Sequence, residues 1–111
     1  RMFHRPVVVK YPHYIQRALE FFKRNNTCTP CILPNYDHTP RSGFRGELLQ
    51  DSTPEDWNKL CRMTKEYIQH NDAIDNLLFI KAWNEWGEGN YLEPDRRWGK
   101  AYLEETAKAL K

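Results

Sequence analysis

The sequence predicts an α/β protein in which short parallel strands alternate with helices. Two apolar runs, residues 31–33 and 77–83, each follow a segment with the 3.6-residue apolar period of a helix. A third helical pattern follows the second run. Because two parallel strands joined through a helix form a right-handed unit, this order favours a parallel sheet with helices packed on it.

The first helix is expected over residues 12–24, where a proline suits the first helical turn. Its apolar side chains recur at i, i+4 and i+7, namely Ile15, Leu19 and Phe22. The first strand is expected at residues 31–33, because the apolar run there is short and stops at Pro34. Residues 35–52 lack a clear period and predict a long loop, a kind of segment that often carries function.

The second helix is expected over residues 52–69, with Ser52 or Thr53 as its cap and Pro54 in its first turn. The second strand is expected at residues 77–83, whose nearly continuous apolar character is typical of a strand covered on both faces. A last helix is expected at roughly residues 96–110, with the preceding aspartate available as a cap.

Composition places the chain among small folded domains. At 111 residues with 40% hydrophobic content it predicts one domain, 1–111, and excludes a disordered segment. The formal charge of +2 is spread along the chain, so nucleic acid is not expected as a partner, and no apolar stretch is long enough for a membrane span. Three cysteines, an odd count, favour a reducing compartment and hence a cytoplasmic location.

Two polar motifs follow the expected strands, at the carboxyl ends where α/β proteins bind ligands. They are "NYDHTPR", residues 35–41, and "NEWGEGNYLEPD", residues 84–95. Glu85 and Glu88 are the candidate catalytic pair, because two carboxyls in one pocket can divide acid and base work. On a continuing strand they would point to opposite faces, so the chain must turn at once.

Glycines at positions 87 and 89 permit such a turn. Trp86 and Tyr91 offer flat apolar faces to a sugar ring, whereas Asn84, Asp37 and Arg41 can hydrogen-bond to hydroxyl groups. This composition suits a carbohydrate better than a phosphate. Trp83 fits the core better than a sugar-stacking surface, because it closes the apolar run.

Each of these candidate functional residues also has a purely structural interpretation. A Glu-x-x-Glu pair is common on solvated helix faces, and Glu93 and Asp95 fit loop anchors or helix caps. Cys28 and Cys31 form a Cys-x-Pro-Cys sequence typical of redox dithiols, but the strand expected after them provides no helix N-terminus to lower a thiol pKa. The four histidines lack metal-ligand spacing, so neither a metal nor another cofactor is expected.

The motifs also carry a family resemblance. "FIKAWNEWGEGNYLEPDRRWGKAYLE", residues 79–104, with "PCILPNYDHTPR", residues 30–41, closely resembles the C-terminal portion of the WbsX-type glycosyltransferases, relatives of the family-99 glycoside hydrolases. The shared features are Asn-Glu-Trp-x-Glu-Gly, then Leu-Glu-Pro-Asp, and an upstream Asp-x-Thr-Pro-Arg.

The resemblance implies the C-terminal segment of a (β/α)₈ TIM-type barrel. In the family-99 hydrolases, which cleave internal mannosidic linkages, the glutamate matching Glu85 assists the sugar 2-hydroxyl and the one matching Glu88 is the general acid/base. The pair matching Tyr36 and Asp37 lines the same pocket, although many relatives have Trp-Asp-Asn where this chain has Tyr-Asp-His. WbsX-type proteins accompany bacterial polysaccharide biosynthesis, so an oligosaccharide or nucleotide-sugar substrate is implied.

The remaining expectations concern completeness. The N-terminal barrel half is absent from these residues, so the segment is expected to pair with that half or to self-associate. Two function classes stay open: a carbohydrate-active enzyme that transfers or hydrolyses glycosyl groups, and a non-catalytic carbohydrate-binding or structural remnant.

Overall fold

The computed structural model describes residues 7–43 and 46–111, except for the side chain of Arg41. The elements in chain order are β1 (Val7–Lys10), α1 (Tyr11–Arg24), β2 (Cys31–Ile32), α2 (Thr39–Ser42), β3 (Glu47–Gln50), α3 (Pro54–Gln69), β4 (Phe79–Ile80), β5 (Asn84–Glu85), the 3₁₀ helix η2 (Trp86–Glu88), β6 (Asn90–Tyr91) and α4 (Ala101–Leu110).

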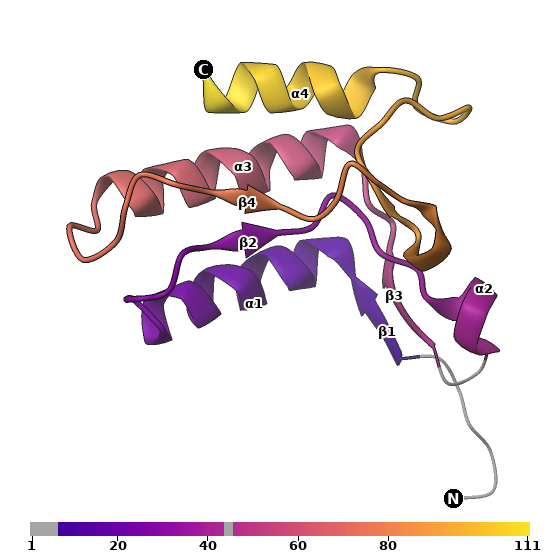
Figure 1. Cartoon of the computed structure of the whole chain (residues 1–111), viewed down its shortest axis with the longest axis horizontal. Helices are drawn as coiled ribbons and strands as arrows, with labels where there is room; N and C mark the ends of the chain where they lie inside the picture. The colour runs from indigo at the N-terminus through magenta and orange to yellow at the C-terminus, as the bar shows by residue number, and fades with distance from the viewer. Residues whose placement is uncertain (1–6, 44–45) are drawn as a thin grey trace, which may run out of the picture.

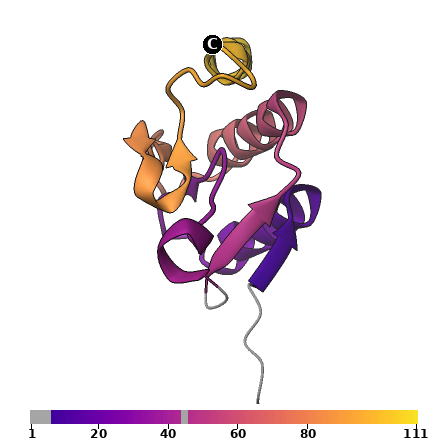
Figure 2. The same ribbon diagram turned by 90° about the vertical axis from the view of Figure 1, so that its right-hand side faces the viewer.

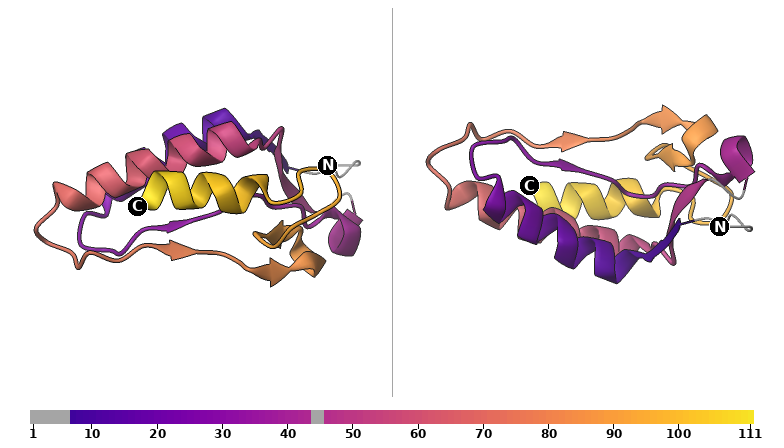
Figure 3. Two further views of the ribbon diagram at one scale, coloured as in Figure 1. Left: turned by 90° about the horizontal axis from the view of Figure 1, so that it is seen from above. Right: turned by 90° about the horizontal axis from the view of Figure 1, so that it is seen from below.

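The three long helices form a layer on one side of the β2–β4 pair (Figures 1 and 3). Helix α3 lies between α1 and α4 and contacts both. Strands β2 and β4 pair in parallel, with Cys31 opposite Phe79 and Ile32 opposite Ile80. All three helices begin at the end of the molecule where these strands finish, as expected for strand–helix units.

The core is formed mainly by the facing sides of the helices. Trp57, Leu60 and Cys61 of α3 are fully buried, and they join Tyr11 of α1 and Tyr102 of α4 in one apolar cluster. The Trp57 indole also donates a 2.8 Å hydrogen bond to Thr106 Oγ1, which ties α3 to α4. The helix layer therefore supplies a rigid base beneath the loops at the strand ends.

Two helices follow their sequence signals closely. Helix α1 begins one residue before the expected start and ends where expected. Helix α3 has Thr53 as its N-cap, whose side chain accepts a 3.2 Å hydrogen bond from the amide of Asp56, and Pro54 lies in the first turn. The apolar period and a first-turn proline were sufficient to place α1, and the Thr53 cap with Pro54 was sufficient to place α3.

The expected loop over residues 35–52 is wrong in part, because it contains α2 and β3. Strand β3 pairs in parallel with β1, from Val7 opposite Glu47 to Lys10 opposite Gln50. This pairing joins segments about forty residues apart, so the spacing of apolar residues within either segment cannot predict it. Strand β1 itself was not expected.

The second strand and last helix are shorter than expected. Within residues 77–83 only Phe79 and Ile80 form a ladder, because β2 offers them two partner residues. The strand is covered on one face, and Leu77 and Phe79 are 53% and 58% exposed. Helix α4 begins at Ala101, because Gly99 has a left-handed φ of 56° that a helix cannot continue through.

We expect Trp57→Ala to lower the free energy of unfolding by about 3–5 kcal/mol, because it removes the largest fully buried side chain. Met63→Ala on the same helix is the matched control: Met63 is 37% exposed, so its loss should cost about 1 kcal/mol or less. Urea unfolding followed by circular dichroism measures both. Equal losses would show that α3 is not the centre of the core.

We expect the 111-residue segment, expressed alone, to elute above its mass of 13.3 kDa in size-exclusion chromatography. The bare face of β4 and the outer edges of the β2–β4 pair favour self-association. Phe79→Lys should shift the peak towards monomer, whereas Phe21→Lys on α1, where the native side chain is 59% exposed, should not. A sharp monomer peak for the unaltered segment would contradict this expectation.

Candidate functional site

A tight hairpin follows the carboxyl end of β4 and carries both candidate glutamates. Strand β5 pairs with β6 in antiparallel fashion, with Glu85 opposite Asn90, and η2 joins the two strands. Gly89 has a left-handed φ of 57°, and its amide donates a 3.0 Å hydrogen bond to the carbonyl of Trp86. The turn expected directly after Glu85 is confirmed. Gly89 supplies its left-handed residue, whereas Gly87 lies within η2.

The loop after β2 packs against this hairpin. The amide of Asp37 donates a 2.8 Å hydrogen bond to the carbonyl of Glu88. A Cβ atom at Gly89 would lie only 2.8 Å from the backbone nitrogen of Asp37, so glycine is required there for packing as well as for φ. The two sequence motifs therefore meet at one end of the molecule, where β3, α2 and the hairpin gather (Figure 2).

The Tyr36–His38 segment is itself fixed by β3. The amide of Leu49 donates to the carbonyl of Tyr36, and the amide of His38 donates to the carbonyl of Glu47, both at 2.8 Å. The Asp37 carboxylate accepts hydrogen bonds from the amide and hydroxyl of Thr39 at 2.9 and 2.5 Å. Asp37 Oδ1 is thus engaged in holding its own loop.

Glu88 forms an ion pair that was not predicted from the sequence. Its Oε1 atom lies 3.3 Å from Nζ of Lys81, and only 25% of the Glu88 side chain is exposed, against 50% for Lys81. Lys81 directly follows β4, and no recognised spacing singled it out. Glu85 is half-buried on the neighbouring strand β5.

Aromatic side chains lie on the same hairpin. The rings of Trp86 and Tyr91 stack with centroids 3.7 Å apart and planes inclined by 16°. Trp86 also donates from Nε1 to Glu93, and it remains 46% exposed. Trp83, interpreted as a core residue, is 52% exposed, so that prediction is wrong for the described chain. Trp83 lies beyond β4, in a bend directly before the hairpin, so the packing of the strand does not cover it.

Asp95 is the anchor of the segment after β6. Its Oδ2 accepts a 2.9 Å hydrogen bond from the Tyr91 hydroxyl, and its Oδ1 accepts one of 2.6 Å from the amide of Trp98. Burial is the main cause, and the hydrogen bond to Asp95 the second, of a rise in the pKa of Tyr91 to about 12. The phenol therefore keeps the proton that it donates. The interpretation of Glu93 and Asp95 as loop anchors is confirmed.

Asn35 links the first motif to the second hairpin strand. Its carbonyl accepts a hydrogen bond from the side chain of Asn90, which is fully buried, and its Oδ1 accepts one of 2.7 Å from the amide of Tyr91. Because these residues are about 55 positions apart, only the fold could reveal the contact.

The predicted site residues do not all line one cavity. A cavity of about 340 Å³ lies between the two loops, and Tyr36, Asp37 and Tyr91 are among its lining residues. Glu85, Glu88, Trp86 and Asn84 are not. Arg41 belongs to α2, but its side chain lies outside the described residues.

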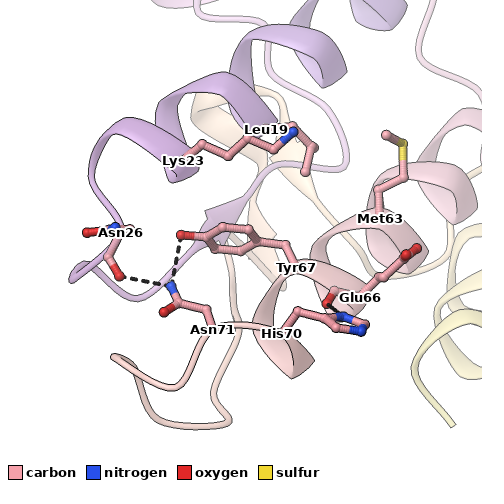
Figure 4. A pocket seen from close by; sticks show the side chains of 8 residues that line it. All are labelled: Leu19, Lys23, Asn26, Met63, Glu66, Tyr67, His70 and Asn71. Atoms are coloured by element: carbon pink, nitrogen blue, oxygen red, sulfur yellow. Dashed lines mark hydrogen bonds between the residues drawn. The ribbon is translucent and has the colours of Figure 1, made fainter.

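A larger groove lies elsewhere, between α1 and α3. It measures about 620 Å³ and is lined by residues of α1 and α3 with the turns that follow them (Figure 4). Its polar groups largely satisfy one another: Asn71 donates to Tyr67 and to the carbonyl of Asn26, and the His70 ring contacts the carbonyl of Glu66. None of the predicted site residues contributes to it.

The family comparison agrees with the two motifs. The family described as Glycosyltransferase WbsX matches residues 2–106. The chain belongs to the WbsX glycosyltransferase family. It is also 37% identical over 90 residues to "Uncharacterized protein WxcX" of two Xanthomonas campestris pv. campestris strains, B100 and ATCC 33913. The match covers 78% of this chain and 13% of each WxcX protein, and no solved structure matches.

The WbsX family is carbohydrate-active. Three further observations concern the redox, metal-binding and membrane-spanning classes. Cys28 and Cys31 are exposed free thiols, and Cys31 begins β2, so a strand rather than a helix follows the dithiol as expected. Residues 7–43 and 46–111 contain no cluster of three metal-ligating side chains. In the same residues, no helix has the length and apolar character of a bilayer span.

We expect Gly89→Ala to destabilise the WbsX-family segment more than Gly99→Ala does. Both glycines have a φ near 57°, but a Cβ at Gly89 meets the Asp37 backbone whereas one at Gly99 meets nothing within 4 Å. Gly99→Ala should therefore show only the conformational cost, about 1 kcal/mol. Denaturant midpoints measured side by side test this, and equal shifts would mean that the contact with Asp37 is not tight.

Proposed function

We propose that this segment is the C-terminal part of a (β/α)₈ barrel whose active site uses Glu85 and Glu88 on a mannose-type polysaccharide or glycan. The reaction is glycosyl transfer or glycoside hydrolysis. WbsX membership supports carbohydrate chemistry, and the parallel β2–β4 pair under a helix layer is consistent with a barrel sector. The chain spans 13% of the length of the WxcX relatives, so the proposal concerns the full natural polypeptide.

The observation that carries the proposal is the position of Glu88. It is three-quarters buried on a hairpin at the carboxyl end of β4, where barrel enzymes place their catalytic groups. Its backbone carbonyl is held by the amide of Asp37, so the carboxyl is displayed from an anchored turn. A catalytic group gains from such anchoring because proton transfer requires a fixed distance to the reacting oxygen.

The two glutamates take different roles. Glu88 is the general acid/base: it gives its proton to the glycosidic oxygen as the bond to the anomeric carbon breaks. It then takes a proton from the incoming water or acceptor hydroxyl. Glu85, on the adjacent strand, takes the proton of the sugar 2-hydroxyl as that oxygen bonds to the anomeric carbon in place of the leaving group. When the incoming oxygen displaces the 2-oxygen from the anomeric carbon, Glu85 returns the proton to the 2-oxygen.

The surrounding side chains supply binding. Trp86 offers a partly exposed ring, supported from behind by Tyr91, on which the C–H face of a sugar can stack. Asn84 and Arg41 remain candidate hydroxyl-binding residues. Tyr36 and Asp37 open into the adjacent cavity, which is large enough at about 340 Å³ for a small ligand.

A second candidate function is carbohydrate binding without turnover. Trp83 and Trp86 favour it, because each is about half exposed on or next to one hairpin and offers a ring on which a sugar can stack without any turnover. Catalysis by contrast requires both glutamates. Measuring binding and turnover on the same variants separates the two functions.

We expect Glu88→Gln and Glu85→Gln, made in the full natural polypeptide, each to lower turnover by at least about a hundredfold. Binding of mannose-containing oligosaccharides should be retained, because the amide preserves the shape of the side chain. Product formation and calorimetric binding are measured in parallel.

The matched control is Glu66→Gln on the exposed surface of α3, which should leave turnover unchanged. Unaltered turnover in both hairpin variants would reduce these glutamates to structural residues. Retained binding with no turnover in the unaltered protein would favour the binding function instead.

A further inference from the structure

We propose that Lys81 is the positioning residue of Glu88: it holds Oε1 and thereby leaves Oε2 as the oxygen that transfers the proton. The inference rests on the proposed function of Glu88 and adds a residue that neither the motifs nor the family description assigns. Its basis is the 3.3 Å contact between Lys81 Nζ and Glu88 Oε1.

Both ends of this ion pair are fixed by the backbone. The amide of Lys81 donates a 3.1 Å hydrogen bond to the carbonyl of Ile32, so β2 fixes the residue directly after β4. At the other end, the amide of Asp37 binds the carbonyl of Glu88. Little main-chain freedom is therefore lost when the two side chains meet, unlike in most surface ion pairs.

Comparison with the other described ion pairs sets this one apart. The Lys10–Asp51 pair has both side chains more than 60% exposed, and the Arg24–Glu20 and Lys108–Glu105 pairs join neighbouring turns of a single helix. Among the cationic side chains of these four ion pairs, that of Lys81 is the least exposed. It also connects the end of a strand to the turn that carries the candidate acid/base. Its location points to the site rather than to general surface solvation.

The geometry has a direct chemical consequence. A carboxyl group that rotates freely offers either oxygen to the substrate, and only some orientations align a proton with the glycosidic oxygen. With Oε1 bound to the ammonium, Oε2 is the remaining oxygen. Lys81 is half exposed and has three N–H donors, so it can hold Oε1 and still donate to a sugar hydroxyl.

The test is a set of kinetic variants in the full natural polypeptide, with mannose-containing oligosaccharides as substrate. Lys81→Met should lower kcat by at least about tenfold while KM changes less than about twofold, because the loss affects proton transfer more than binding. Lys81→Arg, which keeps the charge and the donors, should restore most of the rate. Lys108→Met makes the same substitution in a within-helix ion pair on α4, away from the hairpin, and should leave kcat unchanged.

A double variant shows whether Lys81 acts through Glu88. In a Glu88→Gln background, Lys81→Met should lower the residual rate by less than about twofold, because the group that it positions is already gone. The same tenfold loss in both backgrounds would overturn the inference and assign Lys81 an independent role. A thermal melt within a few degrees of the unaltered protein excludes misfolding as the cause of a loss.

The outcomes separate this inference from the function on which it rests. Full turnover in Glu88→Gln would overturn the proposed function and this inference together. Turnover lost in Glu88→Gln but kept in Lys81→Met would overturn the role of Lys81 alone. An equal loss in Lys81→Arg and Lys81→Met would also count against positioning through the ammonium–carboxylate contact.

Discussion

The close packing of Gly89 against the backbone of Asp37 determines how the candidate site is assembled. The two loops come from different strand–helix units, and within residues 7–43 and 46–111 the sheets have only two strands each. At this contact the hairpin backbone touches the neighbouring loop directly, and a hydrogen bond from Asp37 to Glu88 lies beside it. A side chain at position 89 would separate the loops, and the positions of Glu88, Trp86 and Tyr91 would change together.

Beneath this contact, the helix layer provides stiffness and the polar links provide orientation. Trp57 and its neighbours bury the facing sides of α1, α3 and α4, and the three helix N-termini lie at one end because each helix follows a strand-end segment there. Above them, Asn35 links the first motif to the hairpin, and Asp95 links the hairpin to the segment that leads into α4. Apolar burial sets where the loops start, whereas a few directional hydrogen bonds set how they face one another.

Local chemistry made part of the structure predictable. Thr53 and Pro54 indicate the start of α3, and the glycines at positions 87 and 89 indicate a turn after Glu85. The pairing of β1 with β3 was not predictable, because neither four-residue segment has a period that identifies its distant partner. Lys81 was missed for a similar reason: a lysine after a strand has no meaning until the chain turns back and brings Glu88 to it. Trp83 was misjudged because the apolar run predicts a strand up to residue 83, whereas β4 ends at Ile80 and Trp83 lies outside it, half exposed.

The small size of the hairpin ladder also governs how the molecule opens. Strands β5 and β6 share two residue pairs, whereas α1 and α3 extend over 14 and 16 residues of the helical core. We expect the hairpin to be a separate cooperative unit whose amides exchange with solvent at a lower free energy than those of α3. Ligand binding would then slow exchange in the hairpin first. The segment that displays Glu85 and Glu88 can thus open and rearrange while the helices beneath it stay folded.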